Sequence, residues 1–187
     1  LFNTLNAISA LVVTEDLVRA RQMVDKLSQF LRYALKDEKK GWVSLASEID
    51  ALKLYLSIEK VRFEDRLQVE YVIDESILKR DVPSLILQPL VENAIKHAIN
   101  HMEAGGKIKI TACLEHERLL LTVSDDGPGI AELADGPYGA EAINFSGVGL
   151  KNIVDRLESL YGKSAEVSML NKRGRGLTVQ IRLPVEH

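Results

Sequence analysis

Features that mark several specialised classes of protein are scarce in this chain of 187 residues. It has one cysteine, Cys113, so an internal disulfide is impossible. The thiol lies in an apolar-alternating run, which favours a core or sheet residue in a reducing compartment. No set of cysteines and histidines has the spacing of a zinc site. No run of about 18 apolar residues is present, so no segment is predicted to span a bilayer.

A strong excess of charge is missing as well. The formal net charge is −3, so no basic field attracts nucleic acid or an anionic membrane, and we expect no nucleic-acid partner. The hydrophobic fraction of 46% and the charged fraction of 27% are those of an ordinary globular protein of one or two domains. The sequence has no initiator methionine and no signal peptide, and it opens on Leu1 inside an apolar-periodic segment. We therefore expect an excised piece of a longer, cytoplasmic region.

What the chain does contain at its start is helical periodicity. An apolar seam predicts a first helix to about Val13, and Thr14 is a candidate N-cap for the next. A stripe at heptad spacing predicts a longer second helix; its members are Leu17, Ala20, Val24, Leu27, Leu31 and Ala34. A helical hairpin alone buries little, so we expect residues 1–40 to pair with a second copy in a homodimeric four-helix bundle. The alternative is packing on the rest of the same chain.

Past a charged breaker at 36–41, Ser44 is expected to cap a third helix over about 45–64, in which Glu59 and Arg62 are spaced to pair. The apolar period then changes to two. Strands are predicted at 67–73, 108–114, 119–123, 167–169 and 177–183, with a hairpin around 115–117. With helices at 83–100 and 150–160, the pattern predicts an α+β fold: a two-layer sandwich of helices on a largely antiparallel sheet.

The stretch 83–100 has two unlike faces. Its apolar residues can bury against a sheet, while Asn93, Lys96, His97 and Asn100 fall together on another face. An amide oxygen suits a hard Mg²⁺ ion, and an ammonium group suits phosphate oxygens. This face therefore indicates a metal–polyphosphate site, with a plain solvated face as the alternative.

Two glycine-bearing segments follow. Asp125 comes directly after a strand, where an acceptor-only carboxylate would select the amino group of adenine over the keto oxygen of guanine. Gly127 and Gly129 would let the backbone approach the ring, although the same residues also suit an ordinary tight turn. The second segment is Gly147 to Leu150, which opens a helix whose N–H groups can bind phosphate, or else forms a glycine hinge. The 17 residues between Gly129 and Gly147 fit a lid over a nucleotide.

In this order and spacing, these segments resemble the Bergerat-type ATP-binding fold of histidine kinases, type II topoisomerases, the chaperone Hsp90 and mismatch-repair MutL proteins. The polar face of 83–100 resembles the N box, and the two glycine segments resemble the first and second glycine boxes. Residues 174–178 resemble the closing glycine segment, where Thr178 is expected to approach the nucleotide. The resemblance implies ATP and Mg²⁺ as cofactors, with these nucleotide-binding residues: Asn93, Lys96, His97, Asp125, Gly127, Gly129, Gly147, Val148, Gly149, Leu150 and Thr178.

Further runs narrow the resemblance to LytS-type sensor histidine kinases, and it then covers essentially the whole chain. These runs are Leu1 to Asn6, Leu31 to Tyr33, Tyr55 to Phe63, Leu87 to His97 and Gly147 to Asn152. The resemblance implies a dimerisation hairpin at 1–40, a connecting helix at 41–66 and an ATP-binding catalytic domain at 67–187. It also implies a response-regulator partner and a full-length protein on the cytoplasmic side of a bacterial inner membrane, with membrane contact only through segments outside this sequence.

The family's pattern assigns roles residue by residue. Asn93 would hold Mg²⁺, and Glu92 would act as an acid–base helper or form a structural ion pair. The family's phosphoacceptor histidine would stand two residues before Leu1, so this fragment is expected to bind Mg-ATP without phosphorylating itself. Asn3, four residues after that histidine, would orient water for dephosphorylating the regulator.

Two rival functions stay open on the sequence. The first is an ATP hydrolase of the Hsp90 or MutL kind, which carries a water-activating glutamate one helical turn before the asparagine. Here that position is Pro89, which has no side-chain base. The second rival is a non-catalytic scaffold that transmits signals through its helices.

Overall fold

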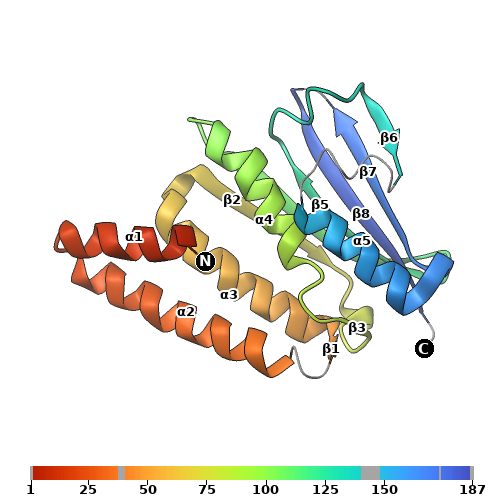
Figure 1. The fold of residues 1–187 in the computed structure, drawn as a ribbon, viewed down its shortest axis with the longest axis horizontal. Helices are drawn as coiled ribbons and strands as arrows, with labels where there is room; N and C mark the ends of the chain where they lie inside the picture. Colours follow the sequence, from red (N-terminus) through yellow and green to blue (C-terminus); the bar gives the residue numbers. More distant parts are fainter. Residues whose placement is uncertain (1, 38–40, 140–147, 173, 186–187) are drawn as a thin grey trace.

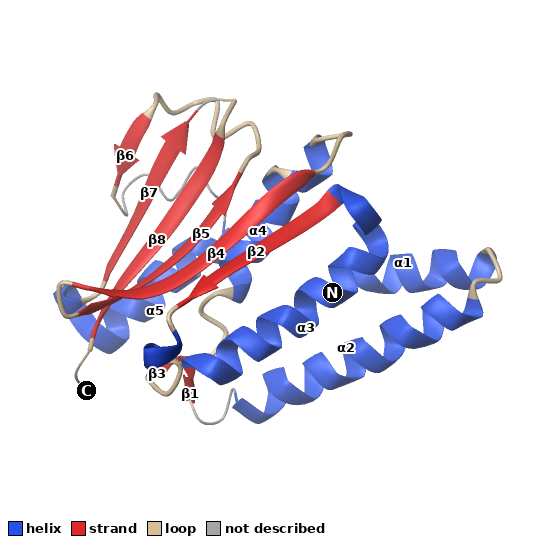
Figure 2. Cartoon of the chain, turned by 180° about the vertical axis from the view of Figure 1, so that it is seen from behind, coloured by secondary structure: helices blue, strands red, loops and turns tan. Residues whose placement is uncertain are grey.

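The computed structural model describes residues 2–37, 41–139, 148–172 and 174–185 (Figure 1). Three helices lie beside the β2 edge of a mixed sheet, and two further helices cover one face of that sheet (Figures 1 and 2). The helices are α1 Phe2–Val13, α2 Leu17–Asp37, α3 Leu45–Phe63, α4 Gln88–His97 and α5 Val148–Tyr161. The strands are β1 Trp42–Ser44, β2 Leu67–Ile73, β3 Asp81–Pro83, β4 Gly106–Glu115, β5 Arg118–Asp125, β6 Gly136–Tyr138, β7 Glu166–Lys172 and β8 Gly176–Pro184.

The main sheet has six strands in the order β2-β4-β5-β8-β7-β6. β2 and β4 are parallel and every other pair is antiparallel, as predicted for a largely antiparallel sheet. The β4–β5 turn falls at His116 and Glu117, both with positive φ, a backbone that closes a two-residue hairpin. Helices α4 and α5 lie on one face, and the other face is open to the viewer in Figure 2. The α+β sandwich predicted from the periodicity is confirmed.

The turn between α1 and α2 differs from the sequence prediction in one respect. Thr14 does not cap α2, because its hydroxyl donates back to the carbonyls of Ala10 and Leu11 at the end of α1. The cap is Asp16, whose Oδ1 accepts from the N–H of Arg19 at 3.2 Å. Asp16 immediately precedes Leu17, so its carboxylate can satisfy an N–H group that the helix itself leaves unpaired.

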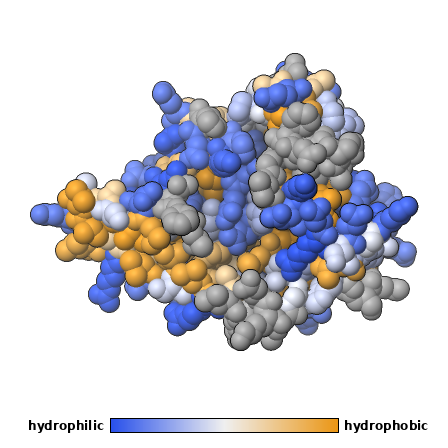
Figure 3. All heavy atoms as spheres, viewed as in Figure 1, coloured by the Kyte–Doolittle hydropathy of each residue, from blue (hydrophilic) through white to orange (hydrophobic). Residues whose placement is uncertain are grey.

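Helix α2 has two apolar stripes, one exposed and one buried. The predicted heptad pattern contains the exposed stripe and part of the buried one. Met23, Leu27 and Phe30 are buried against α3, where Phe30 meets the Tyr55 ring at 5.7 Å between centroids. The residues Leu17, Val24 and Leu31, together with Leu5 and Val12 on α1, are exposed. Apolar side chains accordingly gather over the α1–α2 hairpin in Figure 3. Packing on the same chain, the alternative considered above, therefore accounts for one stripe and leaves the other uncovered.

Helix α3 begins at the predicted cap, since Ser44 accepts from the N–H of Ser47 at 3.2 Å. Its buried residues surround the helix instead of forming one stripe, because α2 packs on one side and the sheet domain on the other. One continuous hydrophobic core extends from Met23 on α2 through α3 to Leu183 on β8. The helix therefore joins the hairpin and the sheet through side-chain packing as well as through the chain.

Helix α4 is shorter than the predicted 83–100. Pro83 belongs to β3, which pairs with β1, and Leu85 has a φ of +56° that a helix does not allow. The Glu48 carboxylate on α3, only 1% exposed, accepts from the N–H groups of Leu85 at 2.8 Å and Leu87 at 2.9 Å. At its other end the chain tightens into a 3-10 turn at Ile99–His101. Contacts with α3, invisible in the local sequence, thus set where α4 starts.

Helix α5 is hydrogen-bonded to the loop that precedes α4. The Arg156 guanidinium donates to the Ser84 carbonyl at 2.6 Å and to the Gly41 carbonyl at 3.4 Å. Residues 84–87 are therefore held from α3 on one side and from α5 on the other. Within the described ranges, no helix is both long and apolar enough to cross a membrane.

Candidate functional site

The polar face predicted on α4 is present but divided. Asn93 and Glu92 are half-buried, whereas Lys96 and His97 in the last turn are exposed. Glu92 and Lys96 line a cavity of about 160 Å³ with Tyr55, Glu59 and Arg62 of α3, and Glu92 also accepts from Gln88 Nε2 at 2.7 Å. Glu92 and Lys96 therefore lie toward α3.

Asp125 stands at the end of β5, where the sequence places it. Its Oδ1 accepts two backbone hydrogen bonds, from Gly127 at 2.9 Å and from Leu177 at 3.3 Å. Both use the same oxygen, and within the described part of the chain Oδ2 makes no hydrogen bond. Burial raises the pKa of Asp125 to about 6, although the two N–H donors act in the opposite direction.

The turn after Asp125 is packed directly against the end of α4. A Cβ on Gly127 would come within 2.4 Å of Ala98 Cβ, so only glycine permits this approach. Gly129 has a φ of +71°, a conformation that glycine adopts freely, and it faces the amide of Asn171. The first glycine segment is thus the point at which α4 meets the sheet.

Two further residues support this turn that the sequence did not single out as site residues. Asn171 on β7 is fully buried; its Oδ1 accepts from Ile130 N at 2.7 Å and its amide donates to the carbonyls of Ile130, Leu133 and Ala134. Gly176 has a φ of +107° and lies against the Asp125 carbonyl. The available signal for Asn171 was its place in register with Val167 and Met169 on the inward face of a strand.

The second glycine segment can be followed only in part. Gly147 falls outside the described residues, and α5 begins at Val148, whose side chain is likewise not described. Gly149 is exposed, and a Cβ there would lie 3.8 Å from Pro89 Cβ at the start of α4. Leu150 is buried in the core, so only its backbone could face a ligand. The first-turn N–H groups of α5, which can bind an anion, therefore lie next to the helix that carries Asn93.

Thr178, predicted for the nucleotide site, is not brought to this place, whereas Asn3 has a separate predicted role in dephosphorylation of the regulator. Thr178 pairs with Ser124 and donates to its hydroxyl at 3.0 Å. Because side chains alternate along a strand, Ser124 and Thr178 lie on the sheet face opposite to Asp125. Asn3 lies in α1, and its side chain is not among those described.

The described residues thus bring α4, the helix that carries Asn93, close both to the start of α5 and to the turn that follows Asp125. An amide oxygen and a neighbouring anion-binding helix end suit a polyphosphate, and a free carboxylate oxygen suits an amino group. Among the described residues, no three histidine, cysteine, aspartate or glutamate side chains cluster as a metal site.

Two protein-family models match segments that together cover most of the chain. Residues 1–67 match the model of the family described as histidine kinase. Residues 81–187 match the model of the histidine kinase-, DNA gyrase B-, and HSP90-like ATPases. The second match covers more than half of the chain and includes every element of the junction just described.

Individual relatives are similar over nearly the whole sequence. The sensor protein LytS of Staphylococcus haemolyticus is 36% identical over 98% of this chain, and the sensor histidine kinase BtsS of Escherichia coli is 36% identical over 98%. The chain spans about a third of these relatives, 32% and 31% of their length. A solved histidine kinase domain, from the blue-light-activated kinase of Erythrobacter litoralis, shares the fold with a TM-score of 0.58 at 21% identity. It aligns with 87% of this chain and 75% of its own.

Proposed function

Since the chain belongs to the histidine kinase-, DNA gyrase B-, and HSP90-like ATPase family, as a region of a LytS-type sensor histidine kinase, we propose that it binds Mg-ATP and presents the γ-phosphoryl group to a histidine. The observation that carries the proposal is the contact between Gly127 and Ala98. It brings the end of α4, the helix that carries Asn93, against the turn that follows Asp125, and we propose that these two residues reach different ends of the same nucleotide.

Each residue has a role that follows from its chemistry. Asp125 Oδ2 accepts from the exocyclic amino group of adenine, and the absent side chain of Gly127 leaves room for the ring. The N–H groups of Val148, Gly149 and Leu150 bind phosphate oxygens. Lys96 and His97 stay candidates for further phosphate contacts, although they lie in the last turn of α4 and Lys96 lines the cavity toward α3. Thr178 is left out of this set because of its place on the opposite sheet face.

The residues also fit a magnesium ion that arrives with the nucleotide. Mg²⁺ keeps several waters and takes only one or two protein oxygens besides phosphates, which matches a single amide such as Asn93 and the absence of a carboxylate cluster among described residues. When bound, the ion would neutralise phosphate charge. The protein's contribution to phosphoryl transfer is then mostly positioning and electrostatics.

The reaction exchanges one bond for another. The bond from the γ-phosphorus to its bridging oxygen breaks, ADP leaves with the electron pair, and an imidazole nitrogen forms the new bond. Glu92 is the candidate to take the imidazole proton, although its hydrogen bond with Gln88 and its position toward α3 equally suit a structural role. The phosphoryl group then passes to an aspartate of a response regulator.

We place the acceptor histidine outside the four of this chain. His97 and His101 lie at the end of α4, His116 lies in the β4–β5 turn, and His187 is outside the described residues. In the intact protein the hairpin would form a homodimer through its exposed stripe, and the region would work on the cytoplasmic side of a bacterial inner membrane. Asn3 stays a candidate for orienting water during dephosphorylation of the regulator.

Calorimetric titration tests the function directly. We expect this chain to bind ATP with Mg²⁺ more tightly than GTP, and Asn93→Ala to weaken the magnesium-dependent binding by at least tenfold, about 1.4 kcal/mol. Incubation with γ-labelled ATP should leave no acid-labile phosphate on the chain. Rapid steady-state hydrolysis would favour an ATP hydrolase instead, and absence of nucleotide binding would favour a non-catalytic scaffold.

A further inference from the structure

One arginine lies where the hairpin, α3 and α4 meet. Arg62 is on the last turn of α3, and its Nη2 donates to Asn100 Oδ1 at 3.1 Å. Asn100 lies in the 3-10 turn Ile99–His101 that comes after α4, and its Nδ2 donates in turn to the Lys96 carbonyl at 3.5 Å. The guanidinium therefore reaches the last turn of α4 through a single amide side chain.

The arginine is itself held from its own helix. Its Nη1 lies 3.4 Å from Oε2 of Glu59, whose side chain is 4% exposed. Its guanidinium also lies over the Phe63 ring at 4.5 Å. Burial raises the pKa of the Glu59 carboxyl, and Arg62 counters that effect. The contacts with Glu59 and Phe63 limit the positions open to the guanidinium. A movement of α3 would therefore carry the guanidinium, and Asn100 bonded to it, along with the helix.

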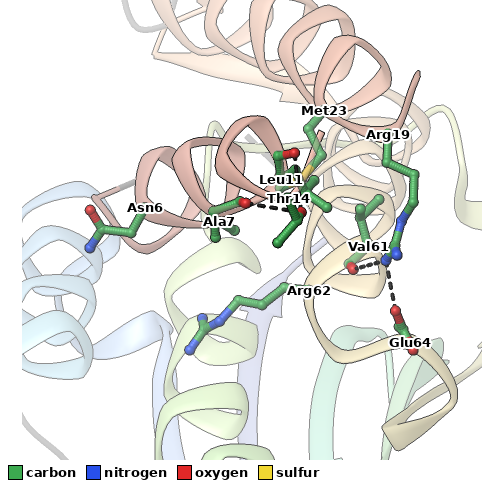
Figure 4. Close-up of a pocket in the computed structure, with 10 residues that line it drawn as sticks. Asn6, Ala7, Leu11, Thr14, Arg19, Met23, Val61, Arg62 and Glu64 are labelled. Carbon is green, nitrogen blue, oxygen red and sulfur yellow. Dashed lines mark hydrogen bonds and ion pairs between the residues drawn. The ribbon is translucent and has the colours of Figure 1, made fainter. Parts of the chain in front are cut away.

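Arg62 lines two cavities, one on each side. The smaller, of about 160 Å³, is the one that also contains Glu92 and Lys96. The larger, of about 530 Å³, lies between the three N-terminal helices and is lined on the α1 side by Asn6, Ala7 and Ala10. Figure 4 shows Arg62 extended beneath α1, toward Asn6 and Ala7, and away from the Arg19–Glu64 pair that closes the other end. Of the residues lining these two cavities, Arg62 alone is common to both.

The end of α4 contacts the turn that carries Gly127 in the proposed nucleotide site. Ala98, next to Lys96 and His97, is the residue against which Gly127 is packed. A shift of the last turn of α4 would displace Lys96 and His97 and press on the turn that orients Asp125. We propose that Arg62 is a positioning residue that sets the end of α4 and makes nucleotide affinity depend on how α1 lies against α3. This inference rests on the proposed ATP binding and concerns regulation of that same site.

The test compares two arginines of α3 and its continuation. Arg62→Met should weaken Mg-ATP binding about tenfold, within the range common for coupled sites, without lowering the melting temperature of the nucleotide-free protein in proportion. Arg66→Met is the matched control, because Arg66 also lies over Phe63 but donates to the Met102 carbonyl and lines neither cavity. It should leave the dissociation constant within twofold of wild type. Arg62→Lys, which can reach one partner but not both, should fall between.

Two double-mutant cycles test whether Arg62 acts through Asn100 and whether its effect depends on α1. Asn100→Ala should weaken binding like Arg62→Met, and combining them should add nothing, since both break one link. Ala7→Leu, which adds volume to the wall facing Arg62, should weaken binding about threefold in the wild-type background and have no effect beside Arg62→Met.

The outcomes separate the two proposals. If the wild-type chain binds no ATP, the proposed function fails and the inference with it. If wild type binds ATP but Arg62→Met only lowers the melting temperature, or weakens binding no more than Arg66→Met, Arg62 is a structural residue and the inference is overturned. An equal effect of Ala7→Leu in both backgrounds would overturn the dependence on α1.

Discussion

At the scale of single residues, Asp125 shows how one carboxylate can serve both the fold and a ligand. Oδ1 is committed to the N–H groups of Gly127 and Leu177, which fix the side chain in place. Oδ2 takes part in neither of these hydrogen bonds, so it can accept one from a ligand in the proposed nucleotide site. Under the proposed function, a carboxylate oriented by the backbone would need no rearrangement to accept from the amino group of adenine, and the keto oxygen of guanine offers no donor there.

The raised pKa of Asp125, about 6, gives this residue a testable pH dependence. Above pH 6 the carboxylate is ionised and accepts from an amino group; as the pH falls through 6 it gains a proton and loses negative charge and acceptor capacity. We expect adenosine affinity to be constant from pH 7 to 8 and about tenfold weaker one unit below the pKa. Adenosine is the ligand of choice because it has no phosphate that titrates in this range.

The control for that titration is Asp125→Asn, which cannot change charge. Its weaker affinity for adenosine should be the same at pH 5 and pH 8. A wild-type profile that stays flat, or an equally steep profile in Asp125→Asn, would show that another group is responsible.

The sequence identified candidate residues where the signal lies in neighbouring positions, and their binding roles stay predictions. Asp125, Gly127 and Gly129 were identified because a strand, a carboxylate and two glycines are consecutive. Asn171 was not, because its four hydrogen bonds reach residues 37 to 41 positions away. Thr178 was placed by resemblance alone, and only the register of β5 and β8 shows which face it occupies.

At the scale of elements, the start of α4 depends on a side chain from another helix. Leu87 caps α4 without a side-chain hydrogen bond of its own, and the Glu48 carboxylate of α3 accepts from the N–H groups of Leu87 and Leu85, at and just before the start of the helix. Negative charge at a helix N-terminus is also favoured by the helix dipole. The orientation of the helix carrying Asn93 is thus determined partly by α3.

Glu48→Gln should therefore destabilise the protein more than a surface substitution. The amide can accept one of the two hydrogen bonds, but its NH₂ group would face the second N–H, leaving a buried donor unpaired at a cost of about 1–3 kcal/mol. The free energy of unfolding, measured by urea denaturation, should fall by about that amount.

Asp50→Asn is the matched control on the same helix, because Asp50 is exposed and its only ion pair, with Lys53, is long at 4.0 Å. It should change the free energy of unfolding by less than about 0.5 kcal/mol. Equal effects of the two substitutions would mean that the Glu48 hydrogen bonds contribute little.

Elements were predictable in proportion to their length and periodicity. The five long strands and the helices were found, and the β4–β5 hairpin fell where expected. The short strands β1, β3 and β6, of three residues each, have no periodicity to detect and exist because tertiary partners lie beside them. The predicted start of α4 at Pro83 was wrong because local pattern could not reveal the pairing of Pro83 with Trp42.

At the scale of the whole molecule, the hairpin presents a stripe that its own chain does not cover. Val24 and Leu31 are exposed one heptad apart on α2, in line with Leu17. Replacing Val24 and Leu31 together by Glu should raise the dimer dissociation constant at least about tenfold, because two charges would have to be buried at the interface. Light scattering coupled to size exclusion would measure the change, and ATP affinity should be unaltered.

The double substitution Gln22→Glu with Gln29→Glu serves as the control for charge, since both residues are exposed one heptad apart on the same helix, on a different side of it from Leu17, Val24 and Leu31. It should leave the dimer intact. A wild-type chain that is monomeric at tens of micromolar would contradict this role for the stripe.

The sequence-based division into hairpin, connecting helix and catalytic domain could not foresee how closely these parts pack. Heptad spacing on α2 suggested one apolar seam, whereas the helix has two, and Met23 and Phe30 belong to the one facing α3. Which stripe meets which partner depends on contacts distant in sequence. Periodicity alone therefore could not decide between self-packing and dimerisation, and the structure leaves room for both.

The stripe of Met23, Leu27 and Phe30 against α3 also limits how freely the α1–α2 pair can swing. Detaching this stripe from α3 would expose three large side chains to water at once, and the burial of each contributes about 1.5–3 kcal/mol to stability. On that scale the detached arrangement would be populated by fewer than roughly one molecule in a hundred, unless a different protein surface shields the same hydrocarbons. Movement of the α1–α2 pair away from α3 would then depend on the binding of such a surface more than on thermal fluctuation.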